Sequence, residues 1–168
     1  PPNICMSAVL KRTSRDPLSR QAMKTHWIGD VISGNHDQSE VHLKGWIHRS
    51  RGSKRLRFVV LRDSTGIVQC VIKRDVVGED AFEAVESALI ESSVEISGTA
   101  IPTDREHGHE VQVSDIRIIG PVDPSRPFPI TESAMAEADG GETEFLLDNR
   151  HLYLRTGRMT TMLKLRSS

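Results

Sequence analysis

The amino-acid sequence predicts an all-β domain with one helix, built as a five-stranded barrel of the OB-fold type. Five short runs alternate β-branched or aromatic residues with polar ones, as strands do when one face is buried. One amphipathic helix pattern falls between the third and fourth runs. The resulting order β-β-β-α-β-β is that of a small Greek-key barrel, a fold whose surface over strands two and three binds oligonucleotides.

The first three strands are expected at residues 41–49, 56–62 and 67–72, where the alternation is clearest. Gly52-Ser53-Lys54 forms the turn after the first strand, because glycine and serine interrupt strands. The second and third strands flank Asp63-Ser64-Thr65-Gly66, a short polar loop that ends in glycine. Such a loop between two alternating runs is a strong hairpin signal.

The second half of the predicted domain contains the helix and two further strands. Residues 79–91 place apolar side chains on one helical stripe, with acids opposite and concentrated in the first turn. Residues 93–100 and 110–119 have the pattern of a fourth and a fifth strand, and the polar loop 102–108 separates them. These assignments complete the predicted barrel.

Four parts of the chain follow from this pattern. Residues 1–40 carry weak signals and form an unassigned N-terminal extension, while residues 41–122 form the OB-fold domain. Residues 123–149 follow and include a proline-rich run that suits neither a regular helix nor a central strand, so an extended hinge or linker is expected there. Residues 150–168 contain five bases and no acid, and their apolar spacing predicts the start of a helix.

Positive charge is concentrated in the first three strands, although the whole chain has a formal charge of −1. Between residues 41 and 74, nine basic residues accompany a single acid, Asp63. The nine are Lys44, Arg49, Arg51, Lys54, Arg55, Arg57, Arg62, Lys73 and Arg74. A basic sheet with an aromatic residue in its middle, here Phe58, can hold a phosphate backbone while a base stacks on the ring. The pattern therefore favours nucleic-acid binding.

The alternation of the second strand leaves the position of Phe58 open. Phe58 lies on the face opposite Val59, and both faces of the strand contain apolar residues. On the outer face the ring would be a stacking platform, and on the inner face it would be part of the core. Gln69 could donate to and accept from a base edge, while Arg49 and Arg51 could bind phosphate or a purine edge.

The sequence contains no recognisable catalytic set, because a glycine-rich phosphate loop, a paired metal-ligand spacing and a nucleophile signature are all missing. His107 and His109 have a spacing that is usually solvated in a loop, so neither a metal site nor a cofactor is expected in this chain. Cys5 and Cys70 lie far apart in the sequence and form neither a metal-ligand set nor a disulfide framework. This indicates a reducing, intracellular compartment.

No apolar run reaches the roughly 18 residues of a membrane span. A cytoplasmic location is expected, and the basic, serine-containing start of the chain leaves an organellar location as the alternative.

Four stretches carry a family resemblance: GWIHRSR (45–51), FVVLRDSTGIVQCVI (58–72), SSVEISGTA (92–100) and EFLLDNRHLYLRTGRMTTMLKLRS (144–167). In order and spacing they resemble the N-terminal part of asparaginyl-tRNA synthetase. This family and its aspartyl and lysyl relatives form a class II subgroup with an OB-fold anticodon-binding domain, a hinge and a large catalytic domain. The resemblance implies that residues 41–168 are the anticodon-binding portion of an asparagine-tRNA ligase.

The resemblance also assigns roles to matching residues. Phe58 would stack on the middle anticodon base, Gln69 would contact the region of the first or middle base, and Arg49 and Arg51 would hold the anticodon loop. The expected tRNA-binding set is completed by two basic turn residues and two residues of the fifth strand, Lys54, Arg55, Glu110 and Gln112.

The third anticodon base has a specific expectation. In aspartyl relatives a glutamate on the fifth strand reads this base, a cytosine, and the matching position here is Gln112, with Glu110 two residues earlier on the same face. A carboxylate only accepts, which suits the amino group of cytosine, whereas an amide also donates, which suits the carbonyl of uracil. Because the asparagine anticodon ends in uracil, Gln112 favours the asparaginyl assignment.

Two alternatives remain at the level of sequence. The barrel motifs are shared with aspartyl enzymes, so the chain could come from an aspartyl-type synthetase. It could also be a non-catalytic RNA-binding or structural protein derived from this domain. Residues 160–168 match only the opening of the first class II motif helix, the homodimer helix at the start of the catalytic domain. Since motifs two and three are absent, this chain should bind tRNA without charging it, while the full parent would use ATP and Mg²⁺.

Overall fold

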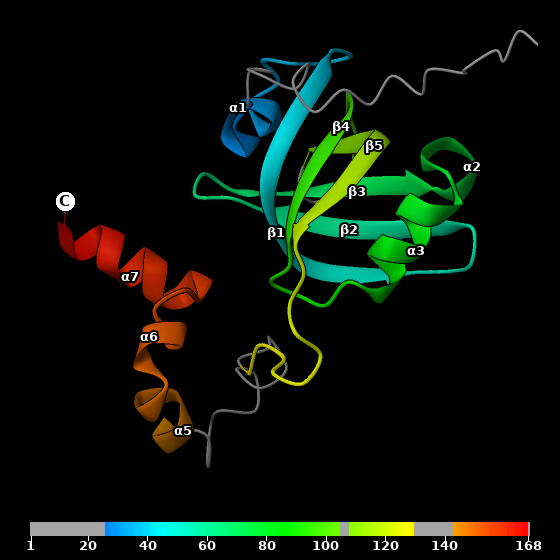
Figure 1. The fold of residues 1–168 in the computed structure, drawn as a ribbon. Helices are drawn as coiled ribbons and strands as arrows, with labels where there is room; N and C mark the ends of the chain where they lie inside the picture. Colours follow the sequence, from blue (N-terminus) through cyan, green and yellow to red (C-terminus); the bar gives the residue numbers. More distant parts are fainter. Residues whose placement is uncertain (1–25, 105–107, 130–142, 168) are drawn as a thin grey trace, which may run out of the picture.

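The alternating runs of the sequence form the strands of a barrel, with short helices against its ends (Figure 1). The structure, a computed structural model, describes residues 26–104, 108–129 and 143–167. Its elements are α1 Ile28–Ile32, β1 Glu40–Gly52, β2 Leu56–Arg62, β3 Ile67–Lys73, α2 Arg74–Val77, α3 Glu79–Ser87, β4 Ser93–Pro102, β5 His109–Gly120, α5 Thr143–Asp148, α6 Arg150–Tyr153 and α7 Gly157–Ser167.

The strand pairing confirms the predicted OB-fold. β1 pairs antiparallel with β2 and with β4, β2 pairs antiparallel with β3, and β4 pairs antiparallel with β5. β3 and β5 pair in parallel, so the order β1-β2-β3-β5-β4 closes on itself. Closure pairs the strands on both sides and removes the open sheet edges that invite aggregation.

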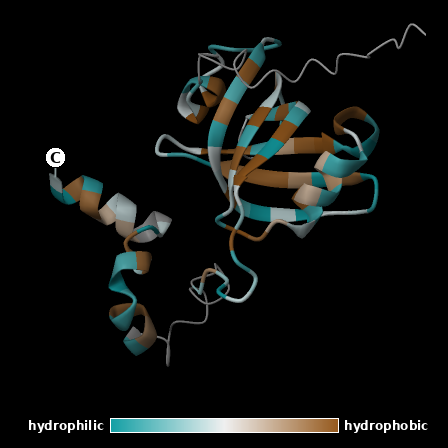
Figure 2. Ribbon diagram, viewed as in Figure 1, coloured by the Kyte–Doolittle hydropathy of each residue, from teal (hydrophilic) through white to brown (hydrophobic). Residues whose placement is uncertain are grey.

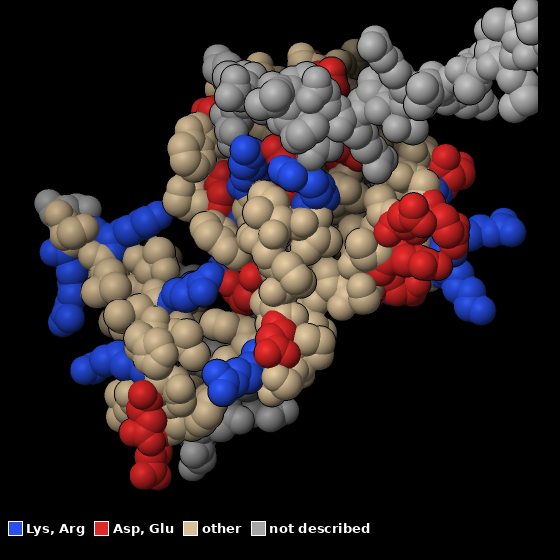
Figure 3. All heavy atoms as spheres, viewed as in Figure 1, with Lys and Arg blue, Asp and Glu red and all other residues tan. Residues whose placement is uncertain are grey.

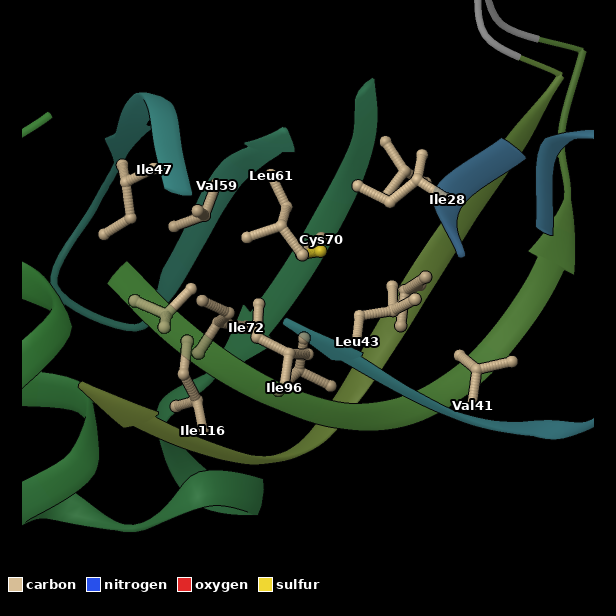
Figure 4. Close-up of a cluster of buried hydrophobic side chains, with 14 of the residues drawn as sticks. Ile28, Val41, Leu43, Ile47, Val59, Leu61, Cys70, Ile72, Ile96 and Ile116 are labelled. Carbon is tan, nitrogen blue, oxygen red and sulfur yellow. The ribbon is translucent and has the colours of Figure 1, made fainter. Parts of the chain in front are cut away.

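The barrel interior is filled by the inward half of each alternating strand. Leu43, Ile47, Leu61 and Ile96 are fully or almost fully buried there, and Figure 4 shows their side chains distributed along the space between the strands. The brown and teal bands that alternate along the strands in Figure 2 are the same period-2 pattern. Burial raises the pKa of the Cys70 thiol, which lies in this core, to about 12, so Cys70 stays a protonated thiol and acts as a small apolar side chain.

Helix α3 closes one end of the barrel. Phe82 and Val85 lie on its apolar stripe and are buried in the core, as the sequence pattern predicts. The helix ends at Ser87, four residues before the expected end at residue 91, because Ala88 has extended backbone angles (φ −70°, ψ 128°) that lead towards β4. Its acids project outward and form the red patch over α3 in Figure 3.

Helix α1 packs into the barrel although it lies in the extension that the sequence pattern leaves unassigned. Ile28 and Val31 are fully buried in the same core cluster as the strand residues. Asp63, in the turn between β2 and β3, holds the start of this helix. One carboxylate oxygen accepts from the amide of Ile28 (2.9 Å), and the other accepts from the amide and hydroxyl of Thr65 (2.7 Å each) and from the amide of Gly66 (3.0 Å).

Replacing Asp63 with alanine is expected to lower the free energy of unfolding by about 2 kcal/mol, because several donors would lose a charged acceptor. Urea unfolding followed by circular dichroism measures the change. Ser64→Ala is the matched control, since Ser64 is exposed in the same turn. Equal midpoints for the two variants would show that Asp63 does not hold α1 on the barrel.

The chain leaves the barrel after β5 and continues to three short helices. The amide of Val122 donates to the hydroxyl of Ser92 (3.1 Å), which ties the start of the linker to the barrel. The range 123–149, expected to be a linker, includes α5 at its end, and residues 130–142 lie outside the described residues. The range 150–168, in which a helix start was expected, contains α6 and α7. Helices α5, α6 and α7 form a separate group beside the barrel (Figure 1).

Candidate nucleic-acid interface

Phe58 lies on the outer face of the barrel, which answers the question that alternation left open. Its neighbours Val59 and Leu61 are fully buried in the core, so the side chains between them point outward. Phe58 itself is half-buried. Its ring is therefore partly available as a stacking surface and is no part of the buried core.

A β-bulge places two arginines on the same face. Ile47 points into the core, and simple alternation along β1 would turn Arg49 and Arg51 inward as well. The pairing with β2 shifts between Ile47 and Arg49. As a result Arg51 stands opposite Phe58, and Arg49 stands opposite Val60. Bulges re-aim side chains in this way next to functional surfaces.

The register arranges the predicted residues in two adjacent rows across β1, β2, β3 and β5, named here the Phe58 row and the Gln69 row. The Phe58 row contains Arg51, Phe58, Val71 and Gln112, and the Gln69 row contains Arg49, Val60, Gln69 and Glu110. Six of the eight predicted binding residues thus share one continuous patch of the outer surface.

Side-chain contacts connect the two rows. The Arg51 guanidinium lies 5.6 Å from the centre of the Phe58 ring, within the range of a cation–π contact. Its Nη2 also donates to Oε1 of Gln69 (3.4 Å), while Nε2 of Gln69 donates to a carboxylate oxygen of Glu110 (3.5 Å). These partners orient the Gln69 amide, with its oxygen towards Arg51 and its nitrogen towards Glu110.

Two further predicted residues lie at the edge of this patch. Lys54 and Arg55 are exposed in the turn between β1 and β2, which directly follows the end of the Phe58 row. Two basic side chains at this position extend the positive charge beyond the ring of Phe58. They can contact phosphates but carry no base-reading geometry.

Several of the basic residues that the sequence groups together neutralise acids of the barrel. Arg57 binds Glu86 on α3 (2.7 Å), Arg62 binds Glu91 (2.7 Å) and Lys44 binds Glu95 (3.4 Å); Arg74 pairs with Glu79 and Glu86. The hydrogen bond from Arg57 lowers the pKa of the Glu86 carboxyl. Charge directed at a nucleic acid therefore comes from fewer residues than the sequence count suggests.

The outer face continues into a cleft that the sequence pattern did not reveal. Trp46 stands opposite Arg62 and is 42% exposed. Together with His48 these residues form one wall of a cleft of about 890 Å³, whose other wall includes Thr160 and Lys164 of α7. Burial, and then the nearby positive charge of Arg62, lower the pKa of His48. Trp46 was visible in the sequence only as one of few aromatic residues.

The described ranges contain no group of three or more histidine, cysteine, aspartate or glutamate side chains that could hold a metal ion. His109 instead binds Asp37 through Nε2 (2.7 Å), and His107 lies outside the described residues. Among the described helices, none is long and apolar enough to cross a membrane.

A closed barrel of this topology, with an aromatic ring, arginines and a polar row on its outer face, defines an OB-fold nucleic-acid-binding domain. Residues 41–119 match the family described as the OB-fold nucleic acid binding domain of the tRNA anticodon type.

Curated relatives and solved structures show which proteins this chain is similar to over most of its length. The chain is 42% identical over 143 residues to an asparagine–tRNA ligase from Thermoplasma acidophilum, an alignment that covers 84% of this chain and 31% of the relative. It is 33% identical to asparaginyl-tRNA synthetase from Pyrococcus horikoshii complexed with asparaginyl-adenylate, with a TM-score of 0.75, over 87% of this chain and 32% of that one. The chain is therefore homologous to asparaginyl-tRNA synthetases over their anticodon-binding OB-fold region, which confirms the resemblance.

Aspartyl-tRNA synthetase from Entamoeba histolytica has a TM-score of 0.73 at 17% identity, over 92% of this chain and 37% of that one. At this identity the likeness shows a shared fold alone. The chain spans about a third of the length of the curated asparagine–tRNA ligases that it matches.

Proposed function

We propose that this chain binds the anticodon loop of a tRNA and is the RNA-recognition part of an asparagine-tRNA ligase. One observation carries the proposal, namely that the Phe58 ring, two arginines and the polar Gln69 row share one outer face of an OB-fold barrel. Such a face binds unpaired bases by stacking and by hydrogen bonds to their edges.

Each residue has a defined part in this proposal. The middle anticodon base stacks on Phe58, a contact worth about 1–3 kcal/mol that does not depend on which base it is. Gln69 lies in the next row and supplies the edge contacts, because its amide both donates and accepts. Arg49, Arg51 and the turn residues bind phosphates of the loop and hold it in register.

Binding to anticodon stem-loops that differ only in the three anticodon bases tests the proposal. At two salt concentrations, the chain is expected to prefer the asparagine anticodon, and its affinity should fall as salt rises. Affinity that is salt-sensitive but indifferent to the three bases would instead support a general RNA-binding or structural protein. A preference for the aspartate anticodon would support the aspartyl alternative.

The third base gives a sharper prediction. Gln112 is exposed in the Phe58 row, whereas Glu110 is half-buried beside Gln69. Gln112→Glu is expected to shift the preference from a loop that ends in uracil towards one that ends in cytosine by about 1–3 kcal/mol, because the carboxylate accepts from the cytosine amino group.

Glu110→Gln is the control for this prediction. If Gln112→Glu leaves the ratio of the two affinities unchanged, the assignment of Gln112 is wrong. A shift caused by Glu110→Gln alone would transfer the role to Glu110. Competition titrations with the two stem-loops measure both ratios.

The parent enzyme is expected to join asparagine to its tRNA using ATP and Mg²⁺, with the catalytic steps in parts that this chain does not span. A homodimer contact is proposed through the helix that contains Thr160. Met162, Leu163 and Leu165 on this helix are exposed apolar residues, which supports such a contact. The proposed compartment is the cytoplasm, because the two cysteines of the sequence form no disulfide framework.

A further inference from the structure

Glu91, between α3 and β4, joins the barrel to the C-terminal helices. One oxygen of its carboxylate binds Nη2 of Arg62 on β2 (2.7 Å). The other oxygen binds Arg155, which follows α6. The side chain of Glu91 is only 10% exposed, and that of Arg62 is 20% exposed. Water therefore screens the Arg62 pair less than a pair on an open surface, whereas the Arg155 side chain is 42% exposed and its pair is screened more.

The backbone of Glu91 is held in an unusual conformation. Its φ is +68°, in the left-handed region, where a residue with a Cβ is strained and glycine is not. Its amide donates to the carbonyl oxygen of Ile47 (2.7 Å), which fixes the turn against β1. A glutamate in this position therefore costs conformational energy that a glycine would avoid. Such outliers point to a role for the side chain.

Two other contacts meet at the same point. Nη1 of Arg62 donates to the carbonyl oxygen of Arg155 (3.3 Å), so the strand also binds the backbone of the helical segment. The Arg155 guanidinium lies 5.5 Å from the ring centre of Phe128, in the linker that follows β5. Strand β2, the linker and the end of α6 thus converge on the carboxylate of Glu91.

We propose that Glu91 is a positioning residue that fixes the C-terminal helices in one orientation against the barrel. Arg62 and Phe58 lie on the same face of β2. This strand therefore carries both the contact to the C-terminal helices and part of the candidate RNA surface. Arg62, Glu91 and Arg155 also line the cleft between Trp46 and α7. This orientation is a property of the described chain itself and does not depend on the identity of the RNA.

The distance between spin labels on the barrel and on α7 tests this role in the 168-residue chain. The labels are placed at Thr99→Cys, exposed on β4, and at Leu165→Cys, which is 74% exposed on α7. A Cys5→Ser background limits labelling to these sites, because Cys70 is buried. The 168-residue chain with Glu91 intact is expected to give one narrow distance distribution. In the Glu91→Gln variant this distribution is expected to broaden.

Glu95→Gln is the matched control. Glu95 also binds two cations, Lys44 (3.4 Å) and Arg117 (2.6 Å), but both belong to the barrel, so this variant should keep the narrow distribution. Arg155→Gln should broaden it like Glu91→Gln, and this change lies outside the barrel core.

The variant Glu91→Gly distinguishes the effect of the Glu91 side chain from the effect of the strained turn in which it lies. Glycine relieves the strained backbone but also removes the ion pair to Arg62 within the barrel, so Glu91→Gly should melt above Glu91→Ala, which keeps the strain, while the narrow distance is lost in both. A narrow distance kept in Glu91→Gln or in Glu91→Gly would overturn the proposal.

Discussion

Replacing Phe58 with alanine is expected to weaken binding of the asparagine anticodon stem-loop about 5- to 150-fold, the effect of losing one stacking contact of about 1–3 kcal/mol. The ring is half-buried on the outer face, with the Arg51 guanidinium over it, so its removal takes away the platform and leaves the core residues Val59 and Leu61 in place. Fluorescence anisotropy of a labelled stem-loop measures the change.

Two controls show whether a loss of affinity comes from the loss of stacking or from the loss of charge. Phe58→Tyr keeps a ring and is expected to bind nearly as well as the parent. The salt dependence of Phe58→Ala should equal that of the parent, because no charge is removed, whereas Arg51→Gln should reduce the salt slope by about one. Parent-like affinity of Phe58→Ala at every salt concentration would show that no base stacks on this ring.

Gly98→Ala is expected to destabilise the barrel by about 3 kcal/mol, a large effect for the addition of one methyl group. A Cβ on Gly98 would stand closer than 3.0 Å to the carbonyl oxygen of Gln112, and 2.9 Å from its carbonyl carbon. Both atoms belong to the backbone of β5, at the point where its register with β4 shifts. Backbone in a closed barrel cannot move aside without breaking strand pairs.

Gly66→Ala is the comparison for this variant. Its Cβ would meet Cδ1 at the end of the half-buried Ile32 side chain at 3.2 Å, which can adjust, and Cγ2 of Ile28 at 3.4 Å, which is ordinary van der Waals contact. Urea unfolding curves should therefore show a much smaller loss for Gly66→Ala than for Gly98→Ala. Similar losses would mean that the close approach of β4 and β5 does not constrain this position.

The secondary structure of the barrel could be predicted because period-2 alternation is a local property of the chain. The strand at residues 56–62 has the predicted bounds, and the other strands differ by up to three residues at their ends. The helix around Phe82 could be predicted for the same reason, because its apolar residues repeat along one face of the helix and that face is the buried one. Its early end could not be predicted, because the backbone at Ala88 follows the path towards β4.

The contribution of α1 to the core could not be read from the chain. A helix of five residues, Ile28–Ile32, is too short to show a reliable apolar period, and alone it would not be stable. It exists in the fold because Ile28 and Val31 are buried against the barrel and because Asp63, distant in sequence, accepts from the amide of Ile28. Both causes are tertiary.

The alternation of residue types along the chain determined that this protein contains an OB-fold barrel with basic and aromatic residues on its strands, and the order of its motifs indicated its likeness to asparaginyl-tRNA synthetases. Only the tertiary structure decided how those residues are used. Alternation cannot choose the face of Phe58 when both faces of the strand are apolar, and it points Arg49 and Arg51 inward. The bulge after Ile47 reverses their direction, because one extra residue in β1 exchanges its two faces and brings both arginines beside the ring.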